Sequence, residues 1–172
     1  MKRIFTIIFF VFLLSQYTKA QDRKMITIQL SYNQIELGFE HKILNEKLFA
    51  ELYAGIANQD INSNLDDFTS RIGIGYTAFF NPKNQFSINT GVGIYVPNND
   101  YYSLIVPLVN AGIRYTRILG KNDKHTLFIN AGYRYGKRDY KQQYSSDIMS
   151  VSTIGTFKLK PFYFSIGYGF KF

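Results

Sequence analysis

The strongest constraint on the fold is the strict alternation of side-chain character over the last eleven residues, 162–172. Large apolar and aromatic residues share one parity, namely Phe162, Phe164, Ile166, Tyr168, Phe170 and Phe172. The other parity holds Tyr163, Ser165, Gly167, Gly169 and Lys171. Because successive side chains of a strand point to opposite faces, one face is apolar and the other is mostly small and polar. This pattern favours the wall of a lipid-embedded β-barrel, with an edge strand of a soluble β-sandwich as the alternative.

The same segment resembles the C-terminal assembly signal of Gram-negative outer-membrane β-barrels, and it matches that signal at Ser165, Gly167, Phe170 and Phe172. The barrel-assembly machinery reads this signal, so the resemblance implies that machinery as a partner during biogenesis. It also implies localisation in the cell outer membrane, where membrane lipids surround the barrel.

Residues 1–20 have the layout of a secretory signal peptide. A short basic start and an apolar run over residues 4–14 precede small residues at positions −3 and −1 of a cleavage site after Ala20. The run is shorter than the ~20 residues of a transmembrane helix, although an uncleaved anchor is the alternative. We therefore expect a signal peptide over 1–20 and one outer-membrane β-barrel domain over 21–172. The chain has no Cys, which excludes disulfides and a lipid anchor on cysteine.

The composition of the mature chain fits a membrane barrel. Cleavage lowers the formal net charge from +8 to +5, because the signal peptide carries three basic residues. Mild basicity in an exported chain does not indicate nucleic acid as a partner. The chain has 14 Tyr and 16 Phe, and aromatic residues form girdles at both membrane–water interfaces of such barrels.

Beyond residue 20 the hydrophobic pattern has a period of two, and clusters of Asn, Asp, Gly and Pro divide the chain. The pattern predicts eight strands at residues 24–32, 35–43, 48–58, 68–80, 86–96, 102–118, 126–136 and 156–172. An even number of strands of membrane-crossing length suits a closed antiparallel barrel. The predicted fold class is all-β, a closed antiparallel eight-stranded transmembrane β-barrel that follows a cleaved N-terminal signal peptide.

Three segments depart from a simple alternation of apolar and polar residues. The apolar parity changes near residue 33, which predicts a tight hairpin at Asn33-Gln34, with a bulge in one long strand as the alternative. A second change near Pro161 predicts a bulge in the last strand. Segment 102–118 is apolar on both faces at its start, and we favour as outward residues Ile105, Val109, Ala111, Ile113 and Tyr115.

Taken together, these features resemble small eight-stranded outer-membrane β-barrel proteins of the porin-like superfamily, over the whole mature chain. With the C-terminus in the periplasm, the turns at 44–47, 81–85 and 119–125 are periplasmic. The extracellular loops are then 33–34, 61–67, 97–101 and 137–155. The last loop is the longest, and it carries Lys137, Arg138, Tyr140, Lys141 and Tyr144.

The inward parity places three carboxylates and four cations in the lumen: Glu36, Glu40, Glu51, Arg71, Arg114, Arg134 and Lys171. Eight strands leave an interior just wide enough for side chains to fill, and unpaired buried charge is costly. We therefore predict a structural network in which Glu51 pairs with one of the three arginines. A selectivity filter or proton relay is the alternative. The outward parity of the strands includes Ile74, Ile94 and Ile129.

Candidate catalytic groups are few. His41 and His125 are the two histidines, and neither has a serine two or three residues away. Asp60, Asp66 and Asp67 lack the spacing of a calcium loop. We expect no catalytic, cofactor-binding or metal-binding residue and no cofactor.

The predicted function is a non-enzymatic integral outer-membrane barrel with a side-chain-filled lumen. It would act in envelope integrity or in surface interaction through its extracellular loops. The alternatives are a narrow channel for small or hydrophobic solutes, a lipid-modifying outer-membrane enzyme, and a soluble secreted β-sandwich. The sequence does not identify an extracellular ligand or surface partner.

Overall fold

The computed structural model describes residues 23–43, 47–58, 65–98, 104–145 and 150–172. The predicted signal peptide and the cleavage site before Gln21 lie outside these residues. In the described part of the chain, no helix is long and apolar enough to cross a membrane.

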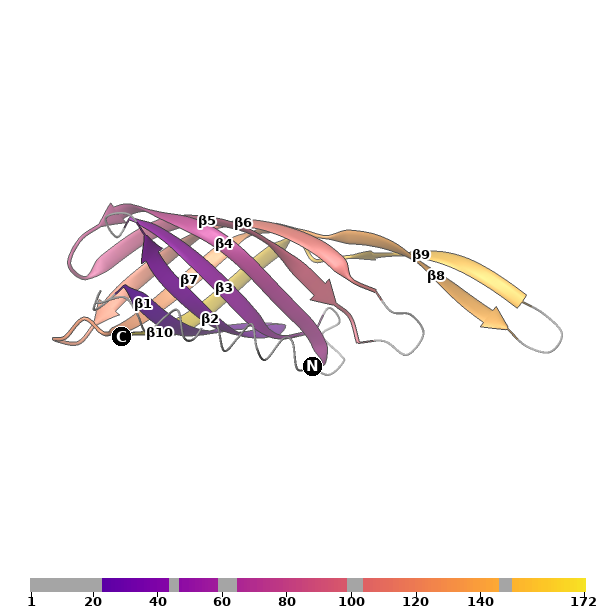
Figure 1. Ribbon diagram of the computed structural model, residues 1–172, viewed down its shortest axis with the longest axis horizontal. Coiled ribbons are helices and arrows are strands. Elements are labelled where there is room, and N and C mark those ends of the chain that lie inside the picture. Colours follow the sequence, from indigo (N-terminus) through magenta and orange to yellow (C-terminus); the bar gives the residue numbers. More distant parts are fainter. Residues whose placement is uncertain (1–22, 44–46, 59–64, 99–103, 146–149) are drawn as a thin grey trace.

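The described chain forms a closed antiparallel β-barrel of eight strands, which confirms the predicted all-β barrel and its number of strands (Figure 1). The barrel strands are β1 (Lys24–Ser31), β2 (Gln34–Ile43), β3 (Leu48–Ala57), β4 (Asp67–Phe80), β5 (Asn84–Val96), β6 (Val106–Leu119), β7 (His125–Tyr135) and β10 (Phe162–Lys171). Their order around the barrel is β1-β10-β7-β6-β5-β4-β3-β2. Strands β8 (Lys137–Ser145) and β9 (Ser150–Lys158) pair only with each other and form a separate hairpin.

The barrel has two distinct ends. The β8–β9 hairpin extends far beyond one end, which we call the hairpin end (Figure 1). The C-terminus, the end of β2 and the connections after β4 and β6 lie at the opposite end, which we call the C-terminal end. Every barrel strand runs between these two ends, so inward side chains can be placed by their height along the lumen.

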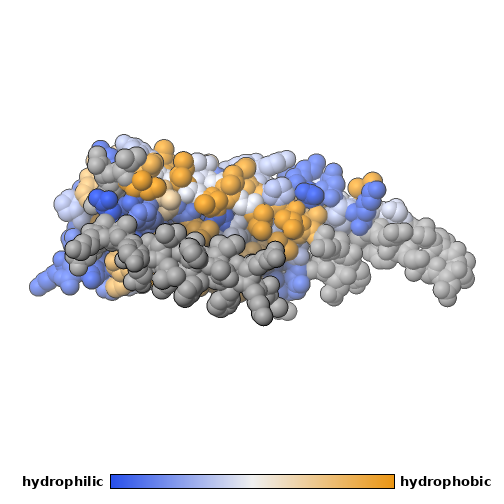
Figure 2. Space-filling view, viewed as in Figure 1, coloured by the Kyte–Doolittle hydropathy of each residue, from blue (hydrophilic) through white to orange (hydrophobic). Residues whose placement is uncertain are grey.

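The distribution of polarity is inverted relative to a water-soluble protein. Among the described residues, 23 buried side chains are polar or charged and 11 are hydrophobic. Large apolar side chains instead face outward along every barrel strand, including Ile72, Ile74 and Val92. On the face that Figure 2 shows, hydrophobic patches lie along the barrel body, and strongly hydrophilic residues are most frequent toward its ends. The polar groups in the interior must therefore satisfy one another.

The first connection is a hairpin, not a bulge. Ser31 pairs with Gln34, so the two turn residues are Tyr32 and Asn33. The predicted turn at Asn33-Gln34 was displaced by one residue, because Gln34 already belongs to β2. The Asn33 side chain stabilises this turn by donating to the Asn58 carbonyl at 2.7 Å.

The predicted last strand, 156–172, is wrong at its start. The chain forms β9, leaves the sheet at residues 159–161, and then enters the barrel as β10. The parity change near Pro161 therefore marks a junction between two strands and not a bulge. The predicted loop 137–155 is correspondingly replaced by β8 and most of β9, with residues 146–149 outside the described part.

The structure explains why the predicted strand 102–118 is apolar on both faces at its start. The outward residues favoured from the sequence are exposed or line the outer wall, and β6 begins at Val106. The inward residues here are also apolar, because they belong to a hydrophobic cluster at the hairpin end. We call this cluster the apolar cap; it consists of Ala57, Tyr95, Leu104, Val106, Leu108 and Leu159, with Tyr140 and Phe157 packed against it.

Candidate functional site in the barrel lumen

Arg114 on β6 lies at the centre of the charged lumen. Its guanidinium donates to Glu40 on β2 and to Glu51 on β3, each at 2.6 Å. It also donates to the Tyr53 hydroxyl at 3.0 Å. All four residues are buried. A short, charge-assisted bond to each carboxylate offsets part of the cost of burying these charges.

Arg71 on β4 forms a second layer, nearer the hairpin end. It lies 3.1 Å from Glu36 on β2 and 3.8 Å from Glu51. Glu36 also accepts a hydrogen bond from the Gln29 side chain of β1. Glu51 thus joins the two arginine layers, and Asn89 donates to its second oxygen at 3.2 Å. Carboxylates and arginines from β2, β3, β4 and β6 are tied together across the lumen.

Aromatic rings support both arginines. The Arg71 guanidinium lies 4.1 Å from the centre of the Tyr53 ring, and Arg114 lies 5.0 Å from that of Phe128. These rings occupy the space above cross-strand glycines. A Cβ on Gly38 would lie 2.3 Å from Tyr53, and one on Gly167 would lie 2.1 Å from Phe128. Glycine is required at these positions because any side chain would displace the ring that holds the arginine.

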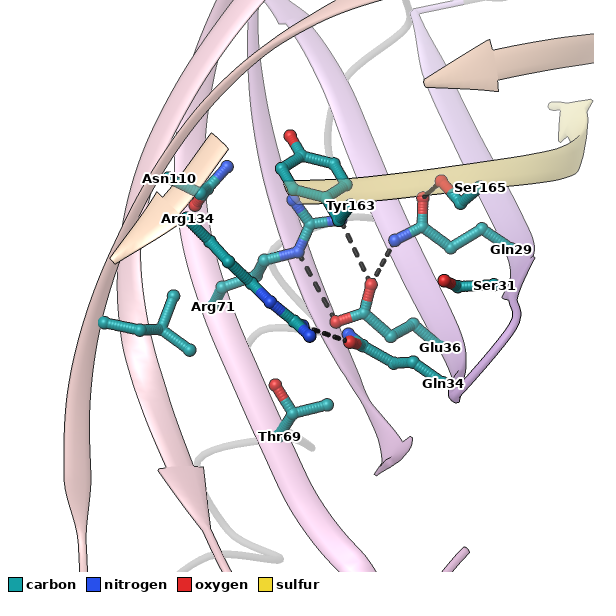
Figure 3. Close-up of a pocket in the computed structure, with 11 residues that line it drawn as sticks. Gln29, Ser31, Gln34, Glu36, Thr69, Arg71, Asn110, Arg134, Tyr163 and Ser165 are labelled. Atoms are coloured by element: carbon teal, nitrogen blue, oxygen red, sulfur yellow. Dashed lines mark hydrogen bonds and ion pairs between the residues drawn. The ribbon is translucent and has the colours of Figure 1, made fainter. Parts of the chain in front are cut away.

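Arg134 lies inside the lumen but outside this network. It donates to the Gln34 side chain at 2.8 Å and to the Lys160 carbonyl at 3.0 Å. Figure 3 shows Arg134 reaching toward Gln34 while Arg71 reaches toward Glu36, on one side of a small cavity. The cavity measures about 30 Å³, which is room for about two water molecules. The Arg134 Nη2 borders it without a hydrogen-bond partner among the described residues.

The seven predicted lumen residues therefore divide into three places. Glu36, Glu40, Glu51, Arg71 and Arg114 are brought together. Arg134 lies nearer the hairpin end, and Lys171 lines a separate pocket at the C-terminal end.

The lumen is closed at two levels. The arginine network fills its middle, and the apolar cap covers it at the hairpin end, where Leu108 also borders the small cavity. Tyr95 anchors the cap by donating to Asp67, and its ring lies 5.7 Å from Phe157 of the hairpin. Sequence reasoning missed the cap and Phe128. The two-sided apolarity of the chain after residue 103 was the available signal for the cap.

The predicted assembly-signal residues lie on both faces of β10. Ser165 faces inward and donates to Gln29 at 3.4 Å, and Gly167 lies beneath the Phe128 ring. Phe170 and Phe172 face outward and are 40% and 43% exposed. The inward half of the motif therefore contributes to the packing of the lumen, whereas the outward half faces away from it.

The two histidines have different surroundings. His125, predicted in a turn, is the first residue of β7, and its Nδ1 lies 2.5 Å from the Tyr168 hydroxyl. The His41 Nδ1 is buried without a hydrogen-bond partner in the described part of the chain. Within those residues, no group of three or more His, Cys, Asp or Glu could hold a metal ion.

No protein-family model matches the chain, and comparison with curated proteins and with solved structures also gives no significant match. A proposal about function therefore rests on the fold and on the residues of the lumen.

Proposed function

We propose that the protein is an integral outer-membrane β-barrel of the porin-like type whose lumen is closed, acting without catalysis in envelope integrity or surface interaction. The observation that carries this proposal is the inverted barrel. Outward apolar side chains on all eight strands would cost free energy in water but match a hydrocarbon environment. The barrel strands of 8–14 residues suit tilted strands that cross a bilayer.

The orientation follows from the fold and the signal-like C-terminus. The short connections after β4 and β6 lie at the C-terminal end, as periplasmic turns do in such barrels. The long β8–β9 hairpin lies at the other end, together with the two-residue turn after β1. The β8–β9 hairpin would then stand outside the cell. Its exposed residues include Arg138, Lys141 and Ile154, so it offers both charge and apolar surface to a partner.

Membrane fractionation tests the location. The protein expressed in a Gram-negative host should sediment with outer membranes and resist extraction with carbonate. Unheated samples should migrate differently from heated samples on a denaturing gel, as folded outer-membrane barrels do. Recovery in the soluble fraction, with no heat-dependent shift, would favour the soluble sandwich.

The mature N-terminus is expected at Gln21. The intact mass of the protein purified from outer membranes should correspond to residues 21–172, because the segment before it has the layout of a signal peptide. A membrane form that retains residues 1–20 would contradict cleavage.

No stable single-channel conductance is expected in planar bilayers. The arginine network fills the middle of the lumen, the apolar cap covers its hairpin end, and the cavity between them measures about 30 Å³. An open porin recorded in the same bilayers provides the positive control. Reproducible conductance steps from the purified protein would instead support the narrow-channel alternative.

Ile74→Arg is expected to destabilise the barrel by ~2–4 kcal/mol, because an arginine would then face hydrocarbon near the middle of a wall strand. Ile74 is 56% exposed in the middle of β4. Ile154→Arg is the matched control, because Ile154 is 73% exposed on the hairpin outside the barrel. Urea unfolding in lipid vesicles measures both variants, and equal midpoints would contradict the lipid-facing wall.

A further inference from the structure

The lumen ends in a basic pocket at the C-terminal end, below the Arg114 network. Five cations and one carboxylate line it: Arg23, Lys24, Lys42, Arg114, Lys171 and Glu40. Arg114 is matched by Glu40 and Glu51. Among the described lining residues Glu40 is the one carboxylate, so the charges of Arg23, Lys24 and Lys42 outnumber it even without Lys171. With Lys171 left out and Glu51 included, four cations stand against two carboxylates, so positive charge is in excess.

Backbone pairing gathers these cations on one arc of the rim. The Lys42 N–H donates to the Arg23 carbonyl at 2.8 Å, and the Phe172 N–H donates to the Lys24 carbonyl at 3.0 Å. Strand β1 lies between β2 and β10, so its basic start is flanked by Lys42 and Lys171. Lys24 and Lys42 are each less than one tenth exposed, so their charges are poorly screened by solvent.

The facing wall provides neutral hydrogen-bonding groups. Thr77, Gln85 and Thr116 come from β4, β5 and β6, and Gln85 pairs with Thr116 in the sheet. The Gln85 side chain is 8% exposed, and its Nε2 has no hydrogen-bond partner within the described chain. An unsatisfied buried donor is costly, so an acceptor that enters the pocket would stabilise this amide.

We propose that this pocket binds a phosphate-type oxyanion between the basic arc and the Gln85 amide. Such a ligand supplies only acceptors, which is what the ammonium groups of Lys24 and Lys42 and the unsatisfied amide require. The enclosed space is about 10 Å³, so a ligand oxygen can enter it while the rest of the anion remains at the rim. The network above closes the lumen, so the ligand binds and leaves from the C-terminal end.

Inorganic phosphate is the first probe. Calorimetric titration of the folded protein in a zwitterionic detergent, at fixed ionic strength, should show saturable binding. The double substitution Lys24→Gln and Lys42→Gln should raise the Kd by at least about tenfold, because it removes two charge-assisted contacts. The matched control is Lys121→Gln with Lys124→Gln, which removes the same charge from exposed residues at the same end outside the pocket. Its Kd should change by less than about twofold.

Gln85→Glu tests the same site by another route. It keeps the size of the side chain but places a carboxylate against the anion, so phosphate binding should be lost. This variant keeps the proposal testable if the double lysine variant fails to fold.

A lipid headgroup is the second source of the same chemistry. Protein reconstituted in phosphatidylcholine nanodiscs, with and without phosphatidylglycerol, is examined by native mass spectrometry for retained lipid. Retention of phosphatidylglycerol by the wild type but not by the double lysine variant assigns the site to a headgroup, even without binding of free phosphate. Phosphate binding without such retention assigns it to a soluble ligand. The proposal is overturned if neither probe binds saturably, or if the wild type and the double lysine variant bind equally.

Discussion

Arg114→Met is expected to lower the free energy of unfolding by ~3–5 kcal/mol. Arg114 donates to Glu40 and Glu51 at 2.6 Å each, inside a lumen where water is largely excluded. Methionine fills part of the same volume but leaves Glu40 without a partner of opposite charge at hydrogen-bond distance among the described residues. Glu51 keeps the hydrogen bond from Asn89 and a longer ion-pair contact of 3.8 Å to Arg71. Urea unfolding of the protein refolded in phospholipid vesicles measures the change.

An exposed ion pair provides the control for Arg114. Lys83 lies 2.9 Å from Asp123, with side chains 47% and 53% exposed. Lys83→Met should change the unfolding free energy by at most ~1 kcal/mol, because solvent screens this pair. Adding Glu40→Gln to Arg114→Met should recover part of the loss, because one unpaired carboxylate is then neutral. Similar midpoints for Arg114→Met and Lys83→Met would contradict a stabilising lumen network.

The alternation of side chains along each strand was sufficient to predict that the charged residues face the lumen. It did not predict which of these residues contact one another. A period of two assigns each side chain to a face, so Arg114, Arg134 and Glu51 were all predicted inside. Contact also requires the same height along the barrel, which depends on register between strands. Arg114 meets Glu51 across 63 positions of sequence. Arg134 lies too near the hairpin end, and it bonds to Gln34 instead.

The hairpin could not be recognised from hydrophobic periodicity. Residues 137–145 are mostly charged and polar on both parities, because neither face of β8 is buried in the barrel. The pattern that reveals a strand arises only where one face is apolar and the other is not. The apolar cap is the converse case. Its strand segment after Val106 is apolar on both faces, because one face lies on the outer wall and the other fills the lumen.

Phe128 could have been found from the sequence. It has the same parity as Asn130 and therefore faces inward, where its ring supports Arg114. The glycine-rich parity of the last strand leaves space for such a ring, and Gly167 pairs directly with Phe128. This pairing matters for the assembly signal. A substitution at Gly167 would disturb the lumen and recognition together, so it cannot separate the two roles.

Phe172→Ala separates recognition from the packing of the lumen. This substitution is expected to lower the amount of protein in the outer membrane sharply. Phe172 faces outward and is 43% exposed, so its ring contributes at most ~1.5–3 kcal/mol to the finished barrel. As the last residue of the signal-like segment, it would instead be read during insertion by the assembly machinery. We expect precursor to accumulate with periplasmic chaperones or to be degraded, while the purified variant still folds in detergent.

Phe164→Ala is the matched control for recognition. Phe164 faces outward on the same strand and is 51% exposed, but it lies outside the four matched positions. The two variants therefore remove the same ring from the same wall, and only Phe172→Ala should reduce insertion in cells. Quantitative immunoblots of outer membranes, with heat-dependent migration of each purified variant, compare insertion with folding. If the outer membranes contain equal amounts of both variants, Phe172 is an ordinary wall residue and the C-terminal segment is not an assembly signal.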